Sequence, residues 1–228
     1  MLIGYDKFRF ILTSYRIVWI GGYTGSHKTS LAFYMARDLL ERGYKLVTNC
    51  PCVWADDMEK IEWQGKHLKT VVVLDEGGLG LKMKRQLEEM CSYVNKMNIV
   101  LIIPSYWEPT PAAQRVTVQS IFGFPDLGIP LRCFKWTVKQ MSFRDSGWFY
   151  WWKPSEVYGV YSRQDPGAKM DGIYNWLLDK VGEFRTKFGY GSEDAMGERD
   201  TSAELVEALD GFRAAMQEQG NITDIGIG

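Results

Sequence analysis

The chain lacks any long apolar segment. Among its 228 residues, no run approaches the roughly 18 to 20 consecutive apolar residues that a membrane-spanning helix needs. We therefore expect no membrane span. The aromatic run WFYWW at residues 148–152 is too short to cross a bilayer, and a buried strand or an oligomer contact is favoured over a membrane interface for it.

Cysteine is scarce, with residues at positions 50, 52, 91 and 133 only. This spacing matches no closed set of zinc ligands, and no signal-peptide pattern precedes it. We therefore expect reduced thiols in a cytosol-like compartment. Cys50 and Cys52 flank a proline. That arrangement leaves a metal or redox role open, but a pair of half-buried thiols is the favoured interpretation.

The chain has almost no net charge, −1 at pH 7, yet its charges are unevenly distributed. Residues 1–188 contain 25 Lys and Arg against 19 Asp and Glu, whereas residues 189–228 contain 2 against 9. The mildly basic body suits contact with phosphate backbones, although such an excess is also common in proteins that bind no anion. The composition predicts one domain over residues 1–188, followed by an acidic linker and a short helical tail over residues 189–228.

Strand and helix patterns alternate along the first hundred residues. A helix with one apolar face is expected from Lys28 to Arg42, ended by Gly43, and another around the apolar stripe from Leu87 to Val94. Because strands that alternate with helices form parallel sheets, the pattern predicts an α/β fold with a mainly parallel, doubly wound sheet. The expected buried strands are residues 16–21, 44–48, 70–75 and 99–103.

The remaining segments carry weaker patterns. The first 15 residues suggest an entering strand or arm, and Thr201 and Glu204 form a capping box that predicts a last helix. That helix would dock either on a neighbouring subunit or on its own body. Further helices are expected at residues 56–61, 112–120 and 169–188, and further strands at 131–141, 148–152 and 158–161.

The strongest functional signal is GGYTGSHKTS at residues 21–30, between a predicted strand and a predicted helix. Triphosphate binding needs backbone N–H groups at a helix N-terminus, a lysine that reaches the β- and γ-phosphate oxygens, and a hydroxyl for Mg²⁺. Lys28 and Thr29 fit the last two roles. The predicted nucleotide-binding residues are Gly22, Thr24, Gly25, Ser26, His27, Lys28, Thr29 and Ser30.

This run resembles the Walker A motif with one departure. His27 stands where the motif has glycine, and a side chain there costs conformational freedom. His27 either weakens nucleotide binding or points outward and is tolerated. The alternative to the whole assignment is a glycine-rich turn that binds no ligand.

A second motif, VVVLDE at residues 71–76, resembles a Walker B motif. Asp75, at the end of a buried strand, is expected to hold the Mg²⁺ shell, and Glu76 to polarise an attacking water. The alternative is an ordinary exit from a strand into a loop. After the next strand, Ser105 is our candidate for contact with the γ-phosphate, with a simple turn residue as the alternative.

Together with VYGVYSR at residues 157–163, these motifs resemble the FtsK/HerA superfamily of P-loop ATPases over about residues 16–165. The small viral genome-packaging ATPases and the zonula-occludens-toxin-like proteins of filamentous phages look nearest. The resemblance implies a RecA-like P-loop NTPase that assembles as a homo-oligomeric ring. It also implies that ATP and Mg²⁺ are used to pull double-stranded DNA through a pore, with a capsid or portal protein as a further partner. A cytoplasmic or virion-associated location would follow.

The same family places a trans-acting arginine finger just before the fourth core strand. Here Lys96 occupies that place, and Arg85 or Arg115 is the alternative. Lys82, Lys84 and Arg85 form a basic loop that would grip DNA phosphates without reading sequence. The alternative for this loop is a solvated helix start.

Three functions are therefore open. The first is an oligomeric ATPase that translocates double-stranded DNA, most simply into a viral capsid. The second is a nucleotide-binding assembly switch in which His27 has blunted catalysis. The third is a phage morphogenesis or extrusion protein that docks through its aromatic run and acidic tail.

Overall fold

The computed structural model describes residues 2–76, 90–106, 108, 114–124, 129–140, 143–152, 157, 159–162 and 170–189. The chain divides into two compact units, Met1–Phe184 and Arg185–Gly228. The second unit therefore begins inside the last described helix, and only its first few residues are described. The fold and the sites below belong to the first unit.

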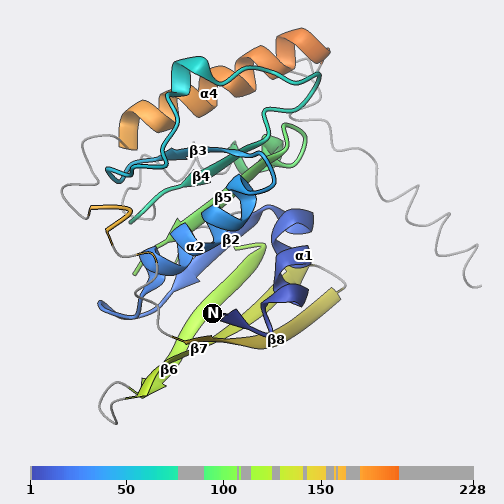
Figure 1. Cartoon of the computed structure of the whole chain (residues 1–228). Helices are drawn as coiled ribbons and strands as arrows, with labels where there is room; N and C mark the ends of the chain where they lie inside the picture. The colour runs from blue at the N-terminus through green and yellow to red at the C-terminus, as the bar shows by residue number, and fades with distance from the viewer. Residues whose placement is uncertain are drawn as a thin grey trace, which may run out of the picture. The chain divides into compact units, whose positions relative to one another are not determined.

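An eight-stranded mixed sheet forms the centre of the first unit (Figure 1). Its order is β1-β8-β7-β6-β2-β5-β4-β3. The pairs β2–β5, β2–β6, β4–β5 and β3–β4 are parallel, and the pairs β6–β7, β7–β8 and β1–β8 are antiparallel. The strands are β1 Leu2–Ile3, β2 Ile17–Gly21, β3 Lys45–Thr48, β4 Thr70–Val73, β5 Ile99–Pro104, β6 Val116–Phe124, β7 Ile129–Gln140 and β8 Phe143–Trp152.

The predicted α/β class with a mostly parallel sheet is confirmed. The four buried strands expected in the first hundred residues became β2, β3, β4 and β5, and the two later strands became β7 and β8. The antiparallel part of the sheet is an addition that alternating strands and helices did not predict. It begins at β6, which pairs parallel with β2 on one side and antiparallel with β7 on the other.

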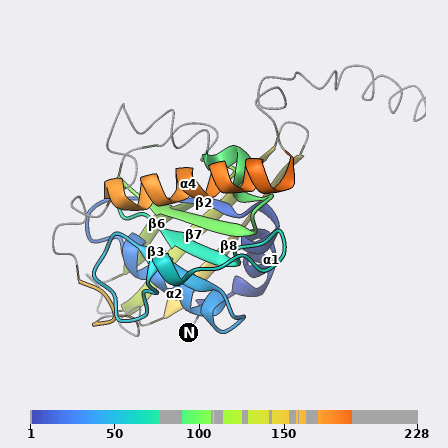
Figure 2. The same ribbon diagram turned by 90° about the horizontal axis from the view of Figure 1, so that it is seen from above.

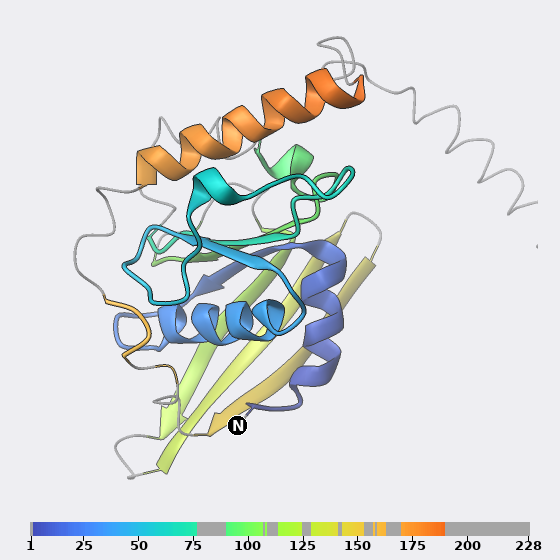
Figure 3. The same cartoon turned by 45° about the horizontal axis from the view of Figure 1, so that its top comes forward.

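Two helices, α1 Tyr5–Tyr15 and α2 Lys28–Leu40, lie across one face of the sheet (Figure 3). Their buried side chains join one apolar cluster with those of the strands beneath, from Val71 in β4 to Trp151 in β8. This cluster removes most of the apolar area of both helices from water, which is the main source of their stability.

The helix α4 Met170–Phe188 buries a separate set of side chains, including Ile173, Leu177 and Val181. Within the first unit it packs against the segment after β3, which contains the short 3₁₀ helix η1 Met58–Lys60. There Trp176 Nε1 donates to the Met58 carbonyl oxygen at 3.2 Å. Figure 2, seen from above, shows α4 over the strands on the side away from α2. The predicted helices at residues 28–42 and 169–188 are thus confirmed, and that at 56–61 is shortened to η1.

The helix α1 overturns the expectation of a strand or arm over the first 15 residues. Tyr5, Phe8 and Leu12 recur at three- and four-residue steps and are all buried. That period is helical, and the density of aromatic and aliphatic residues concealed it. The strand β1 retains only Leu2 and Ile3, which pair with Tyr150 and Trp151 of β8.

The strand β6 overturns the helix expected around residues 112–120. Val116 and Val118 are fully buried on one face and alternate with Thr117 and Gln119 on the other, which is the period of a strand. β-branched residues favour strands, and here pairing partners on both sides decided the outcome.

Several other expectations fall partly or wholly outside the described residues. The helix expected from Leu87 is described, and helical, from Met90 to Val94. In the strand expected at residues 158–161, Tyr158 is outside the described residues, and Tyr161 forms an isolated bridge with Cys52. The basic loop at residues 82–85 and the helix expected after Thr201 also lie outside them.

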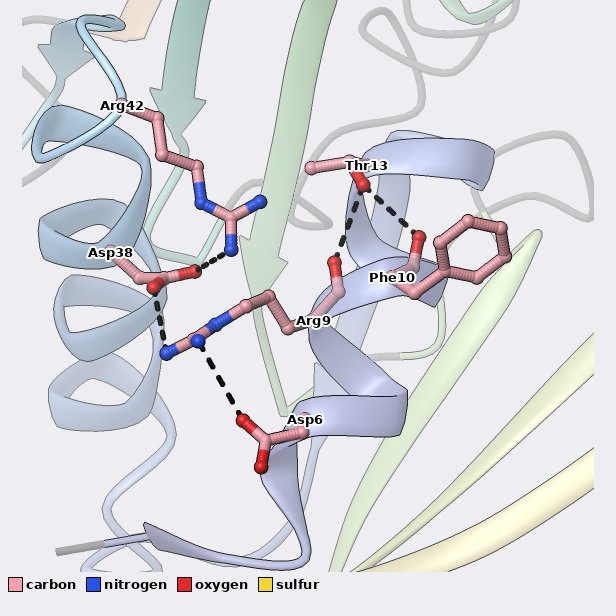
Figure 4. A network of polar contacts seen from close by, with 6 residues as sticks. All are labelled: Asp6, Arg9, Phe10, Thr13, Asp38 and Arg42. Carbon is pink, nitrogen blue, oxygen red and sulfur yellow. Dashed lines mark hydrogen bonds and ion pairs between the residues drawn. The ribbon is translucent and has the colours of Figure 1, made fainter.

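An ion-pair network joins α1 to α2 (Figure 4). Asp38 Oδ1 lies 3.0 Å from Arg9 Nη2, and Asp38 Oδ2 lies 3.4 Å from Arg42 Nη2. Arg9 Nη1 also lies 3.6 Å from Asp6 Oδ1. The Asp38 side chain is only 9% exposed. A buried carboxylate is destabilising unless it is paired with positive charge, so the burial of Asp38 depends on Arg9 and Arg42.

The substitution Asp38→Asn tests this network, because it removes the charge and keeps the shape. Both arginines then lose their buried partner, so we expect the free energy of unfolding to fall by about 1–3 kcal/mol, measured by urea titration. Asp6→Asn is the control. Its side chain is 96% exposed, so it should change stability little. Equal losses in both variants would contradict this account.

Candidate functional site

Three parallel strands end at one edge of the sheet, β2 at Gly21, β4 at Val73 and β5 at Pro104. In α/β sheets the loops at the carboxyl ends of the strands form the binding crevice. A pocket of about 190 Å³ lies at this edge. Its lining is Thr24, Gly25, Ser26, His27, Lys28, Thr29, Asp75 and Glu76.

The loop from β2 to α2 is shaped by two glycines and a serine. Gly25 has φ +79°, which glycine adopts without strain. Gly22 has φ +148°, and a Cβ atom there would lie 2.7 Å from the Ser26 hydroxyl oxygen, so a larger residue would strain the backbone and displace Ser26. The turn is closed by the Ser26 N–H, which donates to the Tyr23 carbonyl oxygen at 3.1 Å. The glycines of the motif are thus needed for the geometry of this loop.

His27 adopts the left-handed conformation, φ +62° and ψ +26°, as the N-cap of α2. The His27 carbonyl oxygen accepts a hydrogen bond from the Leu31 N–H at 2.9 Å, so the residue is fixed by the first turn of the helix. Left-handed backbone costs a residue with a Cβ roughly 1–2 kcal/mol. This cost is the physical reason why glycine suits the position and why histidine there destabilises the loop.

Cationic and polar groups gather around the pocket. Lys28, 7% exposed, donates from Nζ to the carbonyl oxygens of Gly22 at 2.8 Å and Tyr23 at 3.0 Å. The buried Ser26 hydroxyl has no hydrogen-bond partner among the residues that the structure describes. The N-terminus of α2 adds partial positive charge. An ammonium, an unsatisfied hydroxyl and a helix N-terminus together suit a bound anion.

Thr29 and Asp75 meet in the lining of the pocket. Thr29 Oγ1 donates to Asp75 Oδ1 at 2.9 Å, and each residue is 5% exposed. The other carboxylate oxygen, Oδ2, accepts from Cys50 Sγ at 3.6 Å. Both oxygens of this buried carboxylate are therefore hydrogen-bonded, as its desolvation requires.

Asn49 fixes the backbone of Asp75. Its side-chain Nδ2 donates to the Asp75 carbonyl oxygen at 2.9 Å, and the Asp75 N–H donates to its Oδ1 at 2.8 Å. Asn49 is fully buried. The two hydrogen bonds tie the end of β4 to the end of β3 and set the direction of the carboxylate.

The Thr29–Asp75 pair fits a magnesium ion. A hydroxyl and a carboxylate are hard oxygen ligands, and Mg²⁺ commonly takes one or two protein ligands and keeps phosphate oxygens and waters for the rest. No group of three or more His, Cys, Asp or Glu side chains that could hold a metal ion lies within the described ranges. A bound Mg²⁺ would therefore need phosphate or water ligands beside this pair.

Glu76 and Ser105 lie at the ends of neighbouring strands. Glu76 has φ +55°, and its N–H donates to the Pro104 carbonyl oxygen at 2.8 Å. Its Oε2 accepts from the Tyr106 N–H at 3.3 Å. Ser105 is fully buried, and its N–H donates to the Ile20 carbonyl oxygen at 3.0 Å. The loops after β4 and β5 are thus joined beside the pocket.

Most of the predicted nucleotide-binding residues line the pocket, but Gly22 and Ser30 do not. Gly22 shapes the loop, as described above. The Ser30 hydroxyl lies 2.8 Å from the Tyr161 hydroxyl, and the Tyr161 ring stacks on Phe33 with 4.4 Å between ring centroids. Ser30 therefore anchors residues 159–162 to α2.

The structure does not bring Lys96 to the pocket of its own chain. Lys96 lies before β5, at the amino end of the parallel strands, whereas the pocket lies at their carboxyl ends. Its Nζ is 5.2 Å from the centroid of the Tyr93 ring. Arg115 lies before β6 at the same amino edge, where Nη2 donates to the Cys91 carbonyl oxygen at 3.0 Å. Lys82, Lys84 and Arg85 are outside the described residues.

Sequence reasoning missed Asn49, and it named Cys50 as a half-buried thiol without foreseeing its burial against Asp75; both residues follow β3 directly. Their position in the sequence was the available signal. Residues that follow β3 reach the same edge of the sheet as Asp75, which follows the parallel strand β4. The prolines and tryptophans downstream made the segment look irregular and drew attention away from them.

Comparisons with protein-family models, with curated proteins and with solved structures found no match to this chain. None of the helices in the described ranges combines the length and the apolarity that crossing a membrane requires.

The left-handed backbone at His27 gives a first test of the loop. We expect His27→Gly to be more stable than His27→Ala by about 1 kcal/mol, because only glycine adopts this backbone without a Cβ penalty. Urea unfolding of the two variants beside the parent chain measures the difference. If alanine proved as stable as glycine, the backbone at this position would not be under strain.

The buried Cys50 thiol predicts a pH dependence. Burial, reinforced by the neighbouring Asp75 carboxylate, raises the pKa of Cys50 from 9.0 to about 12. Above pH 9 the unfolded chain releases a proton that the folded chain retains, so this contribution to stability is present below pH 9 and is lost as the pH rises toward 12.

Cys50→Ser is the matched variant for this prediction, since its hydroxyl still donates to Asp75 but does not titrate. Urea unfolding at pH 7 and pH 10 should show a larger fall in stability for the parent chain than for Cys50→Ser. Identical falls would mean that the thiol is not held in its neutral form.

Proposed function

We propose that this chain is a Mg²⁺-dependent P-loop ATPase that works as a homo-oligomeric motor on double-stranded DNA, in viral genome packaging. The observation that carries the ATPase assignment is the 2.9 Å hydrogen bond between Thr29 Oγ1 and Asp75 Oδ1. It joins the two predicted metal-binding residues, 46 positions apart in the chain, in the lining of a pocket that Lys28 also lines.

The strand order supports a RecA-like core. In the run β6-β2-β5-β4-β3, the strand before the glycine loop is β2, and the strand before Asp75 is β4. The strand β5 lies between them, so a γ-phosphate bound between the two motifs would lie near its end, where Ser105 is buried and outside the pocket lining. This arrangement provides a structural reason for a polar residue at the end of β5.

Phosphate binding would reorganise the loop. The Lys28 ammonium is satisfied by the Gly22 and Tyr23 carbonyl oxygens, and phosphate oxygens would replace these weaker acceptors with charged ones. The Ser26 hydroxyl, buried at the same place, would gain the partner that it lacks within the described chain. The N-terminus of α2 would add its dipole to the binding of the phosphate.

Hydrolysis needs charge stabilisation and an oriented water. Thr29 and Asp75 would hold the Mg²⁺, which when bound neutralises charge on the phosphate oxygens. Glu76 lines the pocket, and the Tyr106 N–H holds one of its carboxylate oxygens. The other oxygen is then directed by this contact and would accept a proton from the attacking water.

The DNA half of the proposal is supported by charge and by the family resemblance. The body of the chain, residues 1–188, has a positive excess, which suits non-specific phosphate contact. Lys96, at the amino edge of the sheet, could reach a nucleotide only in a neighbouring subunit. A trans role for Lys96 therefore requires the ring.

A nucleotide-binding assembly switch is the second candidate, and the left-handed backbones at His27 and Glu76 favour it. Both residues line the pocket, and each carries a conformation that costs free energy. A nucleotide that bound and relaxed or fixed these residues would change the shape of the site without turnover.

The deciding experiment is steady-state ATP hydrolysis by the full chain, with and without double-stranded DNA. If the chain is a motor, DNA raises turnover. Glu76→Gln then lowers turnover by about 10²-fold or more with nucleotide binding retained, because it removes the base. Lys28→Ala abolishes binding and turnover together.

Glu59→Gln, an exposed glutamate in η1, is the control and should match the parent chain. Tight nucleotide binding with no turnover in the parent, unchanged by Glu76→Gln, would favour the switch. A parent chain that binds no nucleotide at all would overturn both functions.

A further inference from the structure

The antiparallel part of the sheet has two unlike faces. Phe134, Trp136, Phe149 and Trp151 point into the apolar cluster under α1 and α2 and are buried. Because side chains alternate along a strand, the residues between them point to the other face. On β8 these are Trp148, Tyr150 and Trp152, whose side chains remain 44%, 39% and 41% exposed. We call these three residues the aromatic row.

The neighbours of the aromatic row hold it in place. Trp148 lies opposite Lys135, whose Nζ is 5.7 Å from the centroid of the Trp148 ring. Tyr150 lies opposite Cys133 and shares a side-chain hydrogen bond with it. On the far side, Ile3 of β1 pairs with Tyr150 and is 49% exposed. The rings therefore stand on a sheet that fixes their backbone on both sides.

The chemistry of this face suits a polyanion with flat apolar groups. Among the side chains that the structure describes there, Lys135 is charged and no carboxylate is present. The polar neighbours on this face are Thr117, Gln119, Thr137 and Ser146, and the direct partners of Tyr150 and Trp152 are the apolar Ile3, Leu131 and Cys133. Asp145, the nearest acid in β8, is held by Lys7 of α1, with 2.9 Å between Nζ and Oδ2.

We propose that the aromatic row binds single-stranded nucleic acid, with unpaired bases stacked on the rings and Lys135 contacting a phosphate. Rings two residues apart on a strand are spaced by roughly 6.6–6.8 Å, which leaves room for a base on each ring. Aromatic side chains on a sheet surface bind single strands in this way, and the binding is tolerant of sequence because every base has a flat face.

A second copy of the chain is a poorer occupant for this face. Three large rings that are each about 40% exposed offer on the order of 250 Å² together, so a second copy would also have to bury the polar neighbours to reach the area of about 800 Å² that a stable interface buries on each partner. Ile3 and Leu131 add aliphatic surface at the Trp152 end of the row. The polar side chains toward the Trp148 end can hydrogen-bond to base edges and phosphates.

The row is connected to the pocket through the sheet. The register places Trp148 opposite Lys135, Lys135 opposite Gln119, and Gln119 opposite Gly21, where the glycine loop begins. Neighbouring strands lie 4.7–4.9 Å apart, so this line spans roughly 14 Å. A strand bound at the row would lie close enough to influence nucleotide turnover. That last step rests on the proposed ATPase function, but the binding itself does not.

The test is fluorescence anisotropy of a labelled 20-nucleotide oligo(dT) with the full-length chain, in the absence of nucleotide. The parent chain should bind it, and Trp148→Ala and Trp152→Ala should each weaken binding by roughly tenfold or more, which is the effect of losing one stacked base. Trp148→Phe keeps a ring and should retain most of the affinity. Lys135→Gln should reduce the slope of log affinity against log salt concentration by about 0.7.

Phe10→Ala is the matched control, because Phe10 is an aromatic residue 70% exposed on α1 and should leave binding unchanged. A hairpin duplex of equal length should compete poorly, since its bases are paired. Repeating the titration with Lys28→Ala separates this proposal from the ATPase function, because oligo(dT) should bind the variant as it binds the parent.

Three results would overturn the proposal. The first is oligo(dT) binding that is absent in the parent chain or unchanged in Trp148→Ala and Trp152→Ala. The second is a fall in mass by light scattering in those variants together with unchanged binding, which would make the row a contact between copies. The third is a loss of binding in Trp148→Phe as large as in Trp148→Ala, with both variants folded, which would exclude stacking.

Discussion

The pocket depends on the buried carboxylate of Asp75. A carboxylate removed from water must be hydrogen-bonded on both oxygens, and here the partners come from two separate segments, Thr29 at the start of α2 and Cys50 after β3. Asn49 adds two hydrogen bonds to the Asp75 backbone. The satisfaction of one charged group thus fixes the relative positions of α2, β3 and β4, and with them the lining of the pocket.

Backbone strain is concentrated at the same place. His27 and Glu76 both have positive φ, and both are held by hydrogen bonds from elements that are themselves buried, the first turn of α2 and the end of β5. Such conformations persist only where the surrounding structure determines them. The packing of the sheet therefore offsets the conformational free energy of the strained residues His27 and Glu76. As a result, Lys28 and Glu76 line the same small pocket.

The strand β6 divides the sheet into two parts with different surfaces. On one side, β2 and its parallel neighbours are covered on both faces and end at the pocket. On the other side, the long hairpin of β7 and β8 is covered by α1 on one face and leaves the aromatic row exposed on the other. Because β6 pairs with both β2 and β7, backbone hydrogen bonds connect the hairpin to the strand that precedes the glycine loop.

The sequence by itself determined the features that depend on local pattern. These are the buried strands, the apolar face of α2, and the approach of Lys28, Thr29 and Asp75 to one edge, because residues after parallel strands share that edge whatever the rest of the chain does. Only the tertiary structure decided the rest. It made β6 a strand because β2 and β7 offered pairing on both sides. It placed Asn49 and Cys50 against Asp75, and it buried Trp151 against Tyr34 of α2 while leaving Trp148 and Trp152 exposed. Each of these outcomes depends on neighbours distant in the chain, which periodicity and spacing do not encode.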